Sequence, residues 1–189
     1  MNRALGFRLL ILIVLLSTSK MTLATEAAWQ ALAIGEAVLI LRHALAPGTG
    51  DPTEFDINDC ATQRNLSDQG RQEARAWKAY LAARGIDTAR VFTSQWCRAK
   101  DTATAMDIGP VEVMPSLNSF FENRADGPDQ TRATINKVNS LPDAPPVVLV
   151  SHQVNVTALS DIYPASNEGV ILSLPLSDDP SVLARVSPE

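Results

Sequence analysis

The apolar run at residues 38–41, followed directly by Arg42 and His43, is the feature that most constrains the fold. Four consecutive aliphatic residues indicate a strand that is buried on both faces, and such strands occupy inner positions in parallel sheets. In open α/β sheets, ligands bind beyond the carboxyl ends of the strands. We therefore expect Arg42 and His43 to stand at the ligand-binding edge of a parallel sheet.

The rest of the sequence alternates predicted strands with predicted helices. Further strands are expected at 90–94, 111–114, 147–150 and 169–174. Helices are expected from the N-cap Ser67 to Gly85, after 97, at 129–141 and at 153–161, and residues 26–34 are expected to form a short helix or an ordered lead-in. This alternation predicts an α/β fold, a three-layer α/β/α sandwich with a mostly parallel central sheet. The polar tail after residue 174 is expected to be frayed.

Composition limits the size and the partners of this fold. With 189 residues, of which 46% are hydrophobic, the chain can bury one core, and we expect a single domain over 25–189. The net charge of −5 leaves no broad basic surface, which argues against nucleic-acid binding. The sequence carries no indication of an oligomeric state.

The first 24 residues have the layout of a secretory signal peptide. Arg3 and Arg8 precede an apolar run at 9–16, and small residues follow near Ala24. The apolar run is shorter than the roughly 20 residues that span a bilayer. We expect an exported, periplasmic protein with no stable membrane span after cleavage at about residue 24; an uncleaved signal anchor is the alternative.

Export bears on the two cysteines, Cys60 and Cys97. Cysteines in an oxidising compartment can pair, and a disulfide here would pin the long polar loop 44–64 beside the segment that contains Cys97. The alternative is two separate thiols. Their number and spacing do not fit a structural zinc site.

Each histidine of the chain stands at the end of a predicted buried strand. His43 comes two residues after the apolar run 38–41, and His152 comes two residues after the apolar run 147–150. A third predicted strand ends in Ser94, and Arg98 follows four residues later. A lone histidine at a strand end is more often a hydrogen-bonded structural residue. Two of them converging with arginines in an acidic protein favour a site for a small dianion, because guanidinium groups bind phosphate through a fixed fork of donors.

Four segments resemble motifs of the histidine phosphatase superfamily, which includes the phosphoglycerate mutases. Leu41-Arg42-His43-Ala44 resembles its Arg-His-Gly motif. The other segments are Leu66-Ser67 with Gly70, Glu73 and Ala74; Thr93-Ser94 with Arg98, Ala99, Thr102 and Ala103; and Val150-Ser151-His152. They occur in the superfamily's order and on matching predicted elements, so a histidine phosphatase-like fold is expected.

The resemblance implies the role of each residue. His43 would be the nucleophile, forming a phosphohistidine that water then hydrolyses. Arg42, Arg98 and His152 would hold the phosphoryl oxygens through the transition state. Arg64 stands just before the second motif, where small bacterial phosphohistidine phosphatases carry a phosphate-binding arginine; the alternative is a solvated loop cation.

The sequence also departs from the family pattern. Ala44 and Ser151 each replace a glycine, but both are small enough for a phosphate to approach. The segment 117–119 lacks the glutamate that would protonate the leaving oxygen. Glu122 is the nearest acid and the expected proton donor, with Asp126 following it; the alternative is that Glu122 is an exposed loop carboxylate.

The expected function is that of a histidine-type acid phosphatase, a hydrolase acting on a small phosphorylated substrate, either a phosphomonoester or phosphohistidine. No cofactor is expected, and two histidines without a tight acid cluster make a poor metal site. Two alternatives remain. The first is a mutase that returns the phosphoryl group to its substrate, and the second is a non-catalytic periplasmic module that binds a phosphorylated ligand.

Overall fold

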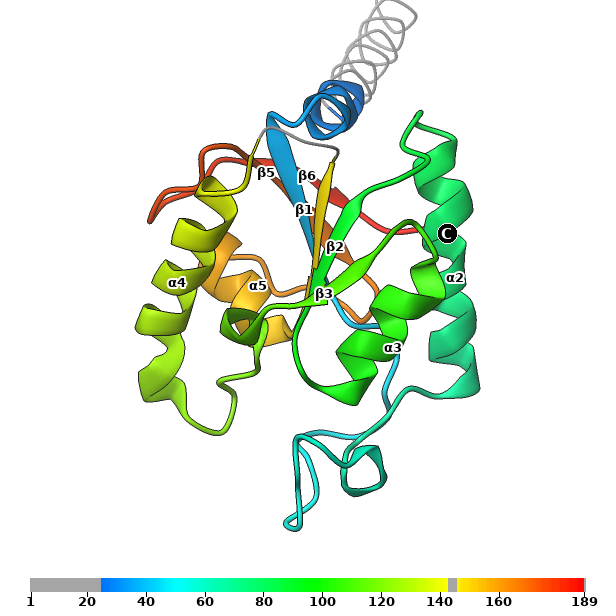
Figure 1. Cartoon of the computed structure of the whole chain (residues 1–189), viewed down its shortest axis with the longest axis vertical. Helices are drawn as coiled ribbons and strands as arrows, with labels where there is room; N and C mark the ends of the chain where they lie inside the picture. The colour runs from blue at the N-terminus through cyan, green and yellow to red at the C-terminus, as the bar shows by residue number, and fades with distance from the viewer. Residues whose placement is uncertain (1–24, 143–145, 189) are drawn as a thin grey trace, which may run out of the picture.

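A six-stranded sheet forms the centre of the computed structural model, which describes residues 25–142 and 146–188 (Figure 1). The strand order is β3-β2-β4-β1-β5-β6. The strands are β1 (Ala37–Arg42), β2 (Arg90–Thr93), β3 (Val111–Val113), β4 (Val147–Ser151), β5 (Gly169–Ser173) and β6 (Val182–Val186). The expected signal peptide, 1–24, lies outside the described residues.

Helices cover both faces of the sheet. Figure 1 shows α2 (Asp68–Ala82) and α3 (Cys97–Met106) on one side, and α4 (Gly127–Asn139) and α5 (Gln153–Ser160) on the other. Residues 25–33 form a further helix, which packs against the same cluster as α2 and α3. The predicted three-layer α/β/α architecture is therefore confirmed.

The apolar run at 38–41 is continuous because β1 is buried on both faces of the sheet. Leu39 and Leu41 pack in the cluster that contains α2 and α3, whereas Val38 and Ile40 pack in the cluster that contains α4 and α5. Successive side chains of a strand point to opposite faces, so a strand covered on both sides needs apolar residues at every position.

Five strands of the sheet run in one direction, and β5 runs in the opposite direction. Strands β3, β2, β4 and β1 pair in parallel, while β5 is antiparallel to β1 and β6 is antiparallel to β5. The carboxyl ends of β1, β2 and β4 therefore meet at one edge of the sheet, and the loop 44–64 projects beyond that edge (Figure 1). The prediction of a frayed tail was wrong, because β6 lies in it and adds an edge strand to β5.

The start of α2 docks tightly against the segment that follows β1. Ser67 is the N-cap, as predicted, and its Oγ accepts a hydrogen bond from the backbone N–H of Gly70. A Cβ atom on Gly70 would lie 2.2 Å from the carbonyl oxygen of Leu45, so only glycine fits there. This contact holds the segment after His43 against the sheet edge.

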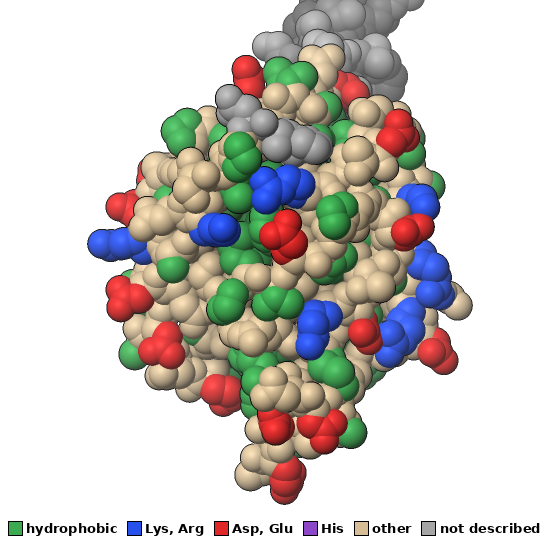
Figure 2. All heavy atoms as spheres, viewed as in Figure 1, with side chains coloured by type: hydrophobic (Ala, Val, Ile, Leu, Met, Phe, Trp, Pro, Cys, Tyr) green, Lys and Arg blue, Asp and Glu red, His purple; other side chains and the backbone are tan. Residues whose placement is uncertain are grey.

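Several predicted boundaries shift in the structure. Helix α4 begins at Gly127, two residues before its predicted start. The predicted loops contain short 3-10 helices: η1 (Cys60–Thr62), η2 (Pro115–Leu117) and η3 (Arg124–Asp126). Within the described residues, no helix is long and apolar enough to cross a membrane. On the face presented in Figure 2, basic and acidic side chains are scattered and form no continuous basic area.

Candidate active site

The register of the sheet brings the predicted site residues together. Arg42 lies opposite Ser151 in the parallel pair β1–β4, and Thr93 lies opposite Val150 in the pair β2–β4. The backbone N–H of His43 donates to the carbonyl of Ser151 at 2.9 Å. Consequently the rings of His43 and His152 meet edge to face, with centroids 5.4 Å apart.

His43 presents an unprotonated nitrogen to the site. Its Nδ1 lies 2.8 Å from the carbonyl oxygen of Ala44, which can only accept, so Nδ1 carries the proton. Its Nε2 therefore has a lone pair, and it accepts a hydrogen bond from Nε of Arg98 at 3.2 Å. Burial, together with the nearby charge of Arg98, lowers the pKa of His43 to about 3. A neutral imidazole with its Nε2 facing the site is the form that a nucleophile needs.

His152 is held by Ser94 through its Nε2 atom. The hydroxyl of Ser94 accepts from the backbone N–H of Trp96 and lies 2.8 Å from Nε2 of His152. Burial is the main cause that lowers the pKa of His152, the charge of Arg98 acts in the same direction, and the ring is neutral. If the Ser94 hydroxyl donates to Nε2, the ring proton lies on Nδ1, on the opposite side of the imidazole.

Arg98 is tied to the loop after β1 through Thr102. One helical turn separates the two residues, and the Thr102 hydroxyl donates to the carbonyl of Arg98 at 2.7 Å. The same hydroxyl accepts from the backbone N–H of Ala44 at 3.0 Å. The spacing of Arg98 and Thr102 in the sequence thus serves to join α3 to the residue that follows His43.

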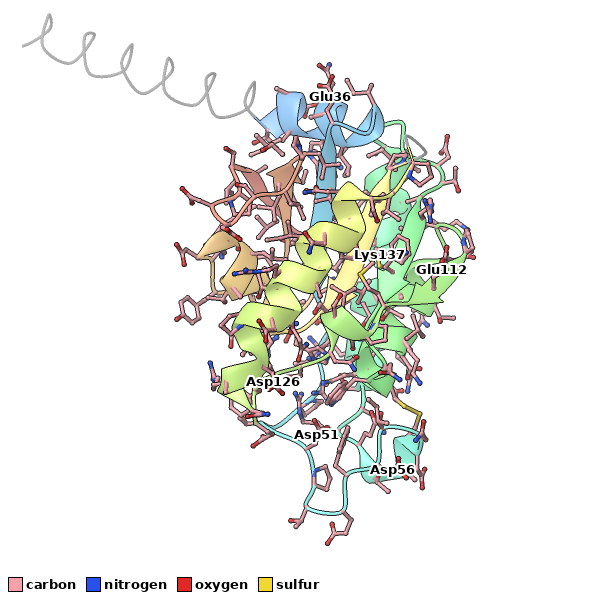
Figure 3. The ribbon with its side chains drawn as sticks, turned by 60° about the vertical axis from the view of Figure 1, so that its left-hand side comes forward. Glu36, Asp51, Asp56, Glu112, Asp126 and Lys137 are labelled. Carbon is pink, nitrogen blue, oxygen red and sulfur yellow. A yellow bond between two sulfur atoms is a disulfide. The ribbon has the colours of Figure 1, made fainter. Side chains whose placement is uncertain are left out.

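Asp51 is a site residue that the sequence analysis missed. Its carboxylate accepts from Arg98 twice, with Nη1 to Oδ1 at 2.7 Å and Nη2 to Oδ2 at 3.0 Å. Burial alone would raise the pKa of Asp51, but the hydrogen bonds from Arg98 and from the backbone N–H of Arg64 bring it below its usual value. Figure 3 shows Asp51 at the end of the molecule from which the loop 44–64 extends.

The other two arginines also reach the site. Arg42 donates from Nη1 to the carbonyl of Pro164, and its buried Nε has no hydrogen-bond partner among the described residues. Arg64 donates from Nε to the carbonyl of Gly50 and from Nη1 to that of Ala46. Arg64 therefore holds together the two parts of the loop 44–64 that contain Ala46 and Gly50. Its Nη2 group is the part of the guanidinium that remains available to an anion.

The structure places the two candidate proton donors differently. Glu122 lines the same cavity as the histidines, and its carboxylate makes no hydrogen bond or ion pair within the described residues. Asp126 lies in η3, accepts from the side chain of Asn123, and is not among the residues that line the cavity. Asn118, in the segment where a glutamate was expected, is bonded to Gln95 instead.

The structure accommodates Ala44 and Ser151, which stand where the family pattern has glycine, and neither side chain narrows the site. Ala44 is fully buried and packs in a small cluster with Leu66 and Ala74. The hydroxyl of Ser151 donates to the carbonyl of Leu117 at 2.7 Å. Its bond therefore ties β4 to η2.

A disulfide joins Cys60 to Cys97, with the Cα atoms 5.7 Å apart. Cys60 lies on the exposed part of the loop, whereas Cys97 is buried and directly precedes Arg98 (yellow bond, Figure 3). The backbone N–H of Cys97 also donates to the side chain of Gln63 at 2.9 Å. The loop that carries Asp51 is thus fastened to the first turn of α3.

Replacing both cysteines by serine is expected to destabilise the protein by about 4 kcal/mol. The disulfide closes a loop between residues 37 positions apart, and its removal frees that loop in the unfolded chain. Urea unfolding of the double variant would measure the change, with the reduced wild-type protein as the control. An unchanged free energy of unfolding would contradict it.

The site opens into a cavity of about 510 Å³, which is much larger than a phosphoryl group requires. Arginine side chains line the cavity together with aromatic and polar side chains. The lining includes Arg42, His43, Asp51, Phe55, Arg64, Trp96, Arg98, Ser119, Phe121, Glu122, Asn123 and His152. Over the described parts of the chain, no group of three or more His, Cys, Asp or Glu side chains is arranged to hold a metal ion.

Comparisons with known proteins agree with this geometry. A family model, "Histidine phosphatase superfamily (branch 1)", matches residues 38–127. No curated protein matches the chain. Among solved structures, the protein histidine phosphatase SixA complexed with tungstate has a TM-score of 0.54 at 21% identity, covering 80% of this chain and 97% of that one.

Two further solved structures are similar. A protein from Agrobacterium tumefaciens that has been assigned as the phosphohistidine phosphatase SixA has a TM-score of 0.54 at 17% identity, covering 82% of this chain and 99% of that one. A mycobacterial glucosyl-3-phosphoglycerate phosphatase with inorganic phosphate has a TM-score of 0.50 at 19% identity, over 73% and 89%. The chain therefore has the histidine phosphatase fold, and its segment 38–127 matches the first branch of the histidine phosphatase superfamily.

Proposed function

We propose that the protein is a phosphatase that hydrolyses a phosphomonoester or phosphohistidine through a covalent intermediate on His43. The observation that carries this proposal is the state of the His43 ring. Its Nδ1–H is held by the Ala44 carbonyl, which leaves the Nε2 lone pair beside the guanidinium of Arg98 in an open cavity. That arrangement pairs a nucleophile with a cation that can hold the group it attacks.

The reaction would proceed in two displacements. In the first, Nε2 of His43 attacks phosphorus, an N–P bond forms, and the bond from phosphorus to the leaving oxygen or nitrogen breaks. Arg42, Arg98 and the Nδ1–H of His152 would stabilise the charge on the three phosphoryl oxygens. In the second, water attacks phosphorus and gives up a proton to the carboxylate of Glu122, the N–P bond breaks, and His43 returns to its neutral state with release of inorganic phosphate.

Glu122 would protonate the leaving oxygen. It lines the cavity and is free of other partners among the described residues, so its carboxyl group can reach a bound substrate. General acid catalysis matters most for poor leaving groups such as alkoxides. Replacing Glu122 by Gln should therefore slow hydrolysis of alkyl phosphates more than hydrolysis of p-nitrophenyl phosphate.

The similar structures support a phosphorylated substrate. One is a protein histidine phosphatase in complex with tungstate, and another is a glucosyl-3-phosphoglycerate phosphatase in complex with inorganic phosphate. Both ligands are tetrahedral oxyanions of the kind that the arginines of the present site would hold. The large cavity leaves room for an organic leaving group next to the phosphoryl group.

Activity would extend to mildly acidic pH, as in an acid phosphatase. With the pKa of His43 lowered to about 3, its nucleophilic nitrogen stays unprotonated in the free enzyme throughout that range. Dependence of the rate on pH would then come from the proton donor and from the substrate.

The test is a screen of the purified protein against p-nitrophenyl phosphate, alkyl phosphomonoesters and phosphohistidine at mildly acidic and neutral pH. Turnover that releases inorganic phosphate is the expected result. Tight binding of inorganic phosphate without turnover of any of these compounds would show a binding module instead.

Export of the protein remains part of the proposal. Two features support a periplasmic location: the N-terminus resembles a signal peptide, and the protein has a disulfide, which is rare in reducing compartments. Cell fractionation with N-terminal sequencing should find a processed form that begins near residue 25 outside the cytoplasm. An intact form in the cytoplasm would contradict export.

A further inference from the structure

Asp51 makes the most extensive contacts with Arg98 of any residue in the site. The Asp51–Arg98 pair is shielded from water, since their side chains are 13% and 4% exposed. Both terminal nitrogens of Arg98 bind the carboxylate, at 2.7 and 3.0 Å. An ion pair of this geometry fixes the plane of the guanidinium as well as its position.

The carboxylate is itself held from the opposite side. Oδ1 of Asp51 accepts from the backbone N–H of Arg64 at 3.1 Å, and Oδ2 accepts from the indole N–H of Trp96 at 2.9 Å. Each oxygen therefore has two hydrogen bonds, one from Arg98 and one from a fixed donor. The Trp96 ring is in turn stacked on Phe55, with ring centroids 5.1 Å apart.

The remaining edge of Arg98 faces the nucleophile. A guanidinium has two edges that can bind an anion with two hydrogen bonds, one formed by Nη1 and Nη2 and the other by Nε and Nη2. Asp51 occupies the first edge. On the second, Nε bonds to Nε2 of His43 at 3.2 Å, and Nη2 has no further partner among the described residues.

We propose that Asp51 is a positioning residue. Its carboxylate holds one edge of the Arg98 guanidinium so that the other edge faces a phosphoryl group at Nε2 of His43. This inference rests on the proposed function, because it assigns the free edge of Arg98 to the phosphoryl oxygens.

The geometry speaks against Asp51 as an internal competitor that must leave before phosphate can bind. Such a residue would sit on the edge of Arg98 nearest to His43 and would be weakly held. Asp51 instead lies on the far edge and is anchored by two donors besides Arg98.

The test compares kinetic parameters and ligand binding in Asp51→Asn. An amide cannot accept from both terminal nitrogens of Arg98, so the guanidinium loses its restraint. We expect kcat for p-nitrophenyl phosphate to fall by about 10- to 100-fold, while KM and the affinity for inorganic phosphate change less than about threefold. A residue that only stabilises the fold would not produce this split between kcat and KM.

Two further variants keep the proposal testable if Asp51→Asn folds poorly. Trp96→Phe removes one hydrogen bond from Oδ2 but retains an aromatic ring against Phe55, and it should lower kcat less, again without raising KM. Asp59→Asn is the matched control: Asp59 lies on the same loop, its Oδ1 caps η1, and an asparagine can keep that hydrogen bond. Its kinetics should equal those of the wild type.

A double-mutant cycle shows whether Asp51 acts through Arg98. In an Arg98→Ala background, adding Asp51→Asn should cause no further loss of kcat, because the group that it positions is gone. Additive losses would overturn the proposal, as would unchanged kcat in both Asp51→Asn and Trp96→Phe. Higher kcat with tighter phosphate binding in Asp51→Asn would instead identify Asp51 as a competitor.

Binding of orthovanadate separates this inference from the proposed function. Vanadate can adopt the five-coordinate geometry of phosphoryl transfer, so it needs the oriented edge of Arg98 more than phosphate does. Calorimetry should show vanadate binding weakened about tenfold in Asp51→Asn and phosphate binding retained. Absence of turnover in the wild type would reject the proposed function. Equal vanadate affinities of the wild type and Asp51→Asn would reject the role of Asp51.

Discussion

Replacing His43 by asparagine should lower kcat for p-nitrophenyl phosphate by at least about 10⁴-fold, because the nucleophile of the reaction is removed. The asparagine side chain can still donate toward the Ala44 carbonyl, as Nδ1 of the histidine does at 2.8 Å. It has no atom with a nucleophilic lone pair in the place of Nε2. The expected defect is therefore chemical and should leave the site assembled.

Steady-state kinetics and binding of inorganic phosphate by the same variant would check this expectation. Phosphate affinity should persist, because Arg42, Arg98 and His152 remain. A circular dichroism spectrum and an intact Cys60–Cys97 disulfide would show that the variant is folded. Turnover within tenfold of the wild type would mean that His43 is not the nucleophile.

Acidification should destabilise the folded protein by about 5 kcal/mol through His43 alone. The pKa of His43 is lowered to about 3 in the folded state, against about 6.5 in the unfolded chain. Between these values the unfolded state binds a proton that the folded state does not bind. Stability is therefore highest above pH 6.5 and falls by about 1.4 kcal/mol per pH unit as the pH drops through this window.

His152 and Asp51 also contribute to the dependence of stability on pH. His152, whose pKa is also lowered, should steepen the loss. Asp51 contributes in a more acidic range, because its lowered pKa gives stability that is lost only below its usual value near 3.8.

Urea unfolding at a series of pH values between about 7.5 and 4 would measure the slope. The His43→Asn variant is the control, since it should lose the His43 contribution and show a shallower dependence than the wild type. Equal slopes in the two proteins would contradict a strongly lowered pKa for His43 in the folded state.

Much of the fold could be predicted from the sequence because burial on both faces leaves a clear pattern. The runs at 38–41 and 147–150 are apolar at every position, and both became neighbouring inner strands. Strand β6 was missed for the opposite reason. Only one of its five residues, Val186, is buried, and the strand forms because β5 offers an edge to pair with, which no local pattern reveals.

The convergence of His43, Arg98 and His152 followed from one rule, since each comes at or just after the carboxyl end of a parallel strand. Asp51 could not be found in this way. It is one of several acids in the loop 44–64, and its sequence neighbours do not set it apart from Asp56 or Asp59. Its place depends on how that loop folds back, with Arg64 clamping it and the disulfide fastening it to α3.

The most direct test is to trap the covalent intermediate. The wild-type protein, mixed with p-nitrophenyl phosphate and quenched rapidly in base, should carry one phosphoryl group on the peptide that contains His43. That group should be stable in base, labile in acid and absent from His43→Asn. Turnover in which no phosphohistidine forms at His43, or in which the phosphoryl group is found on another residue, would contradict the mechanism.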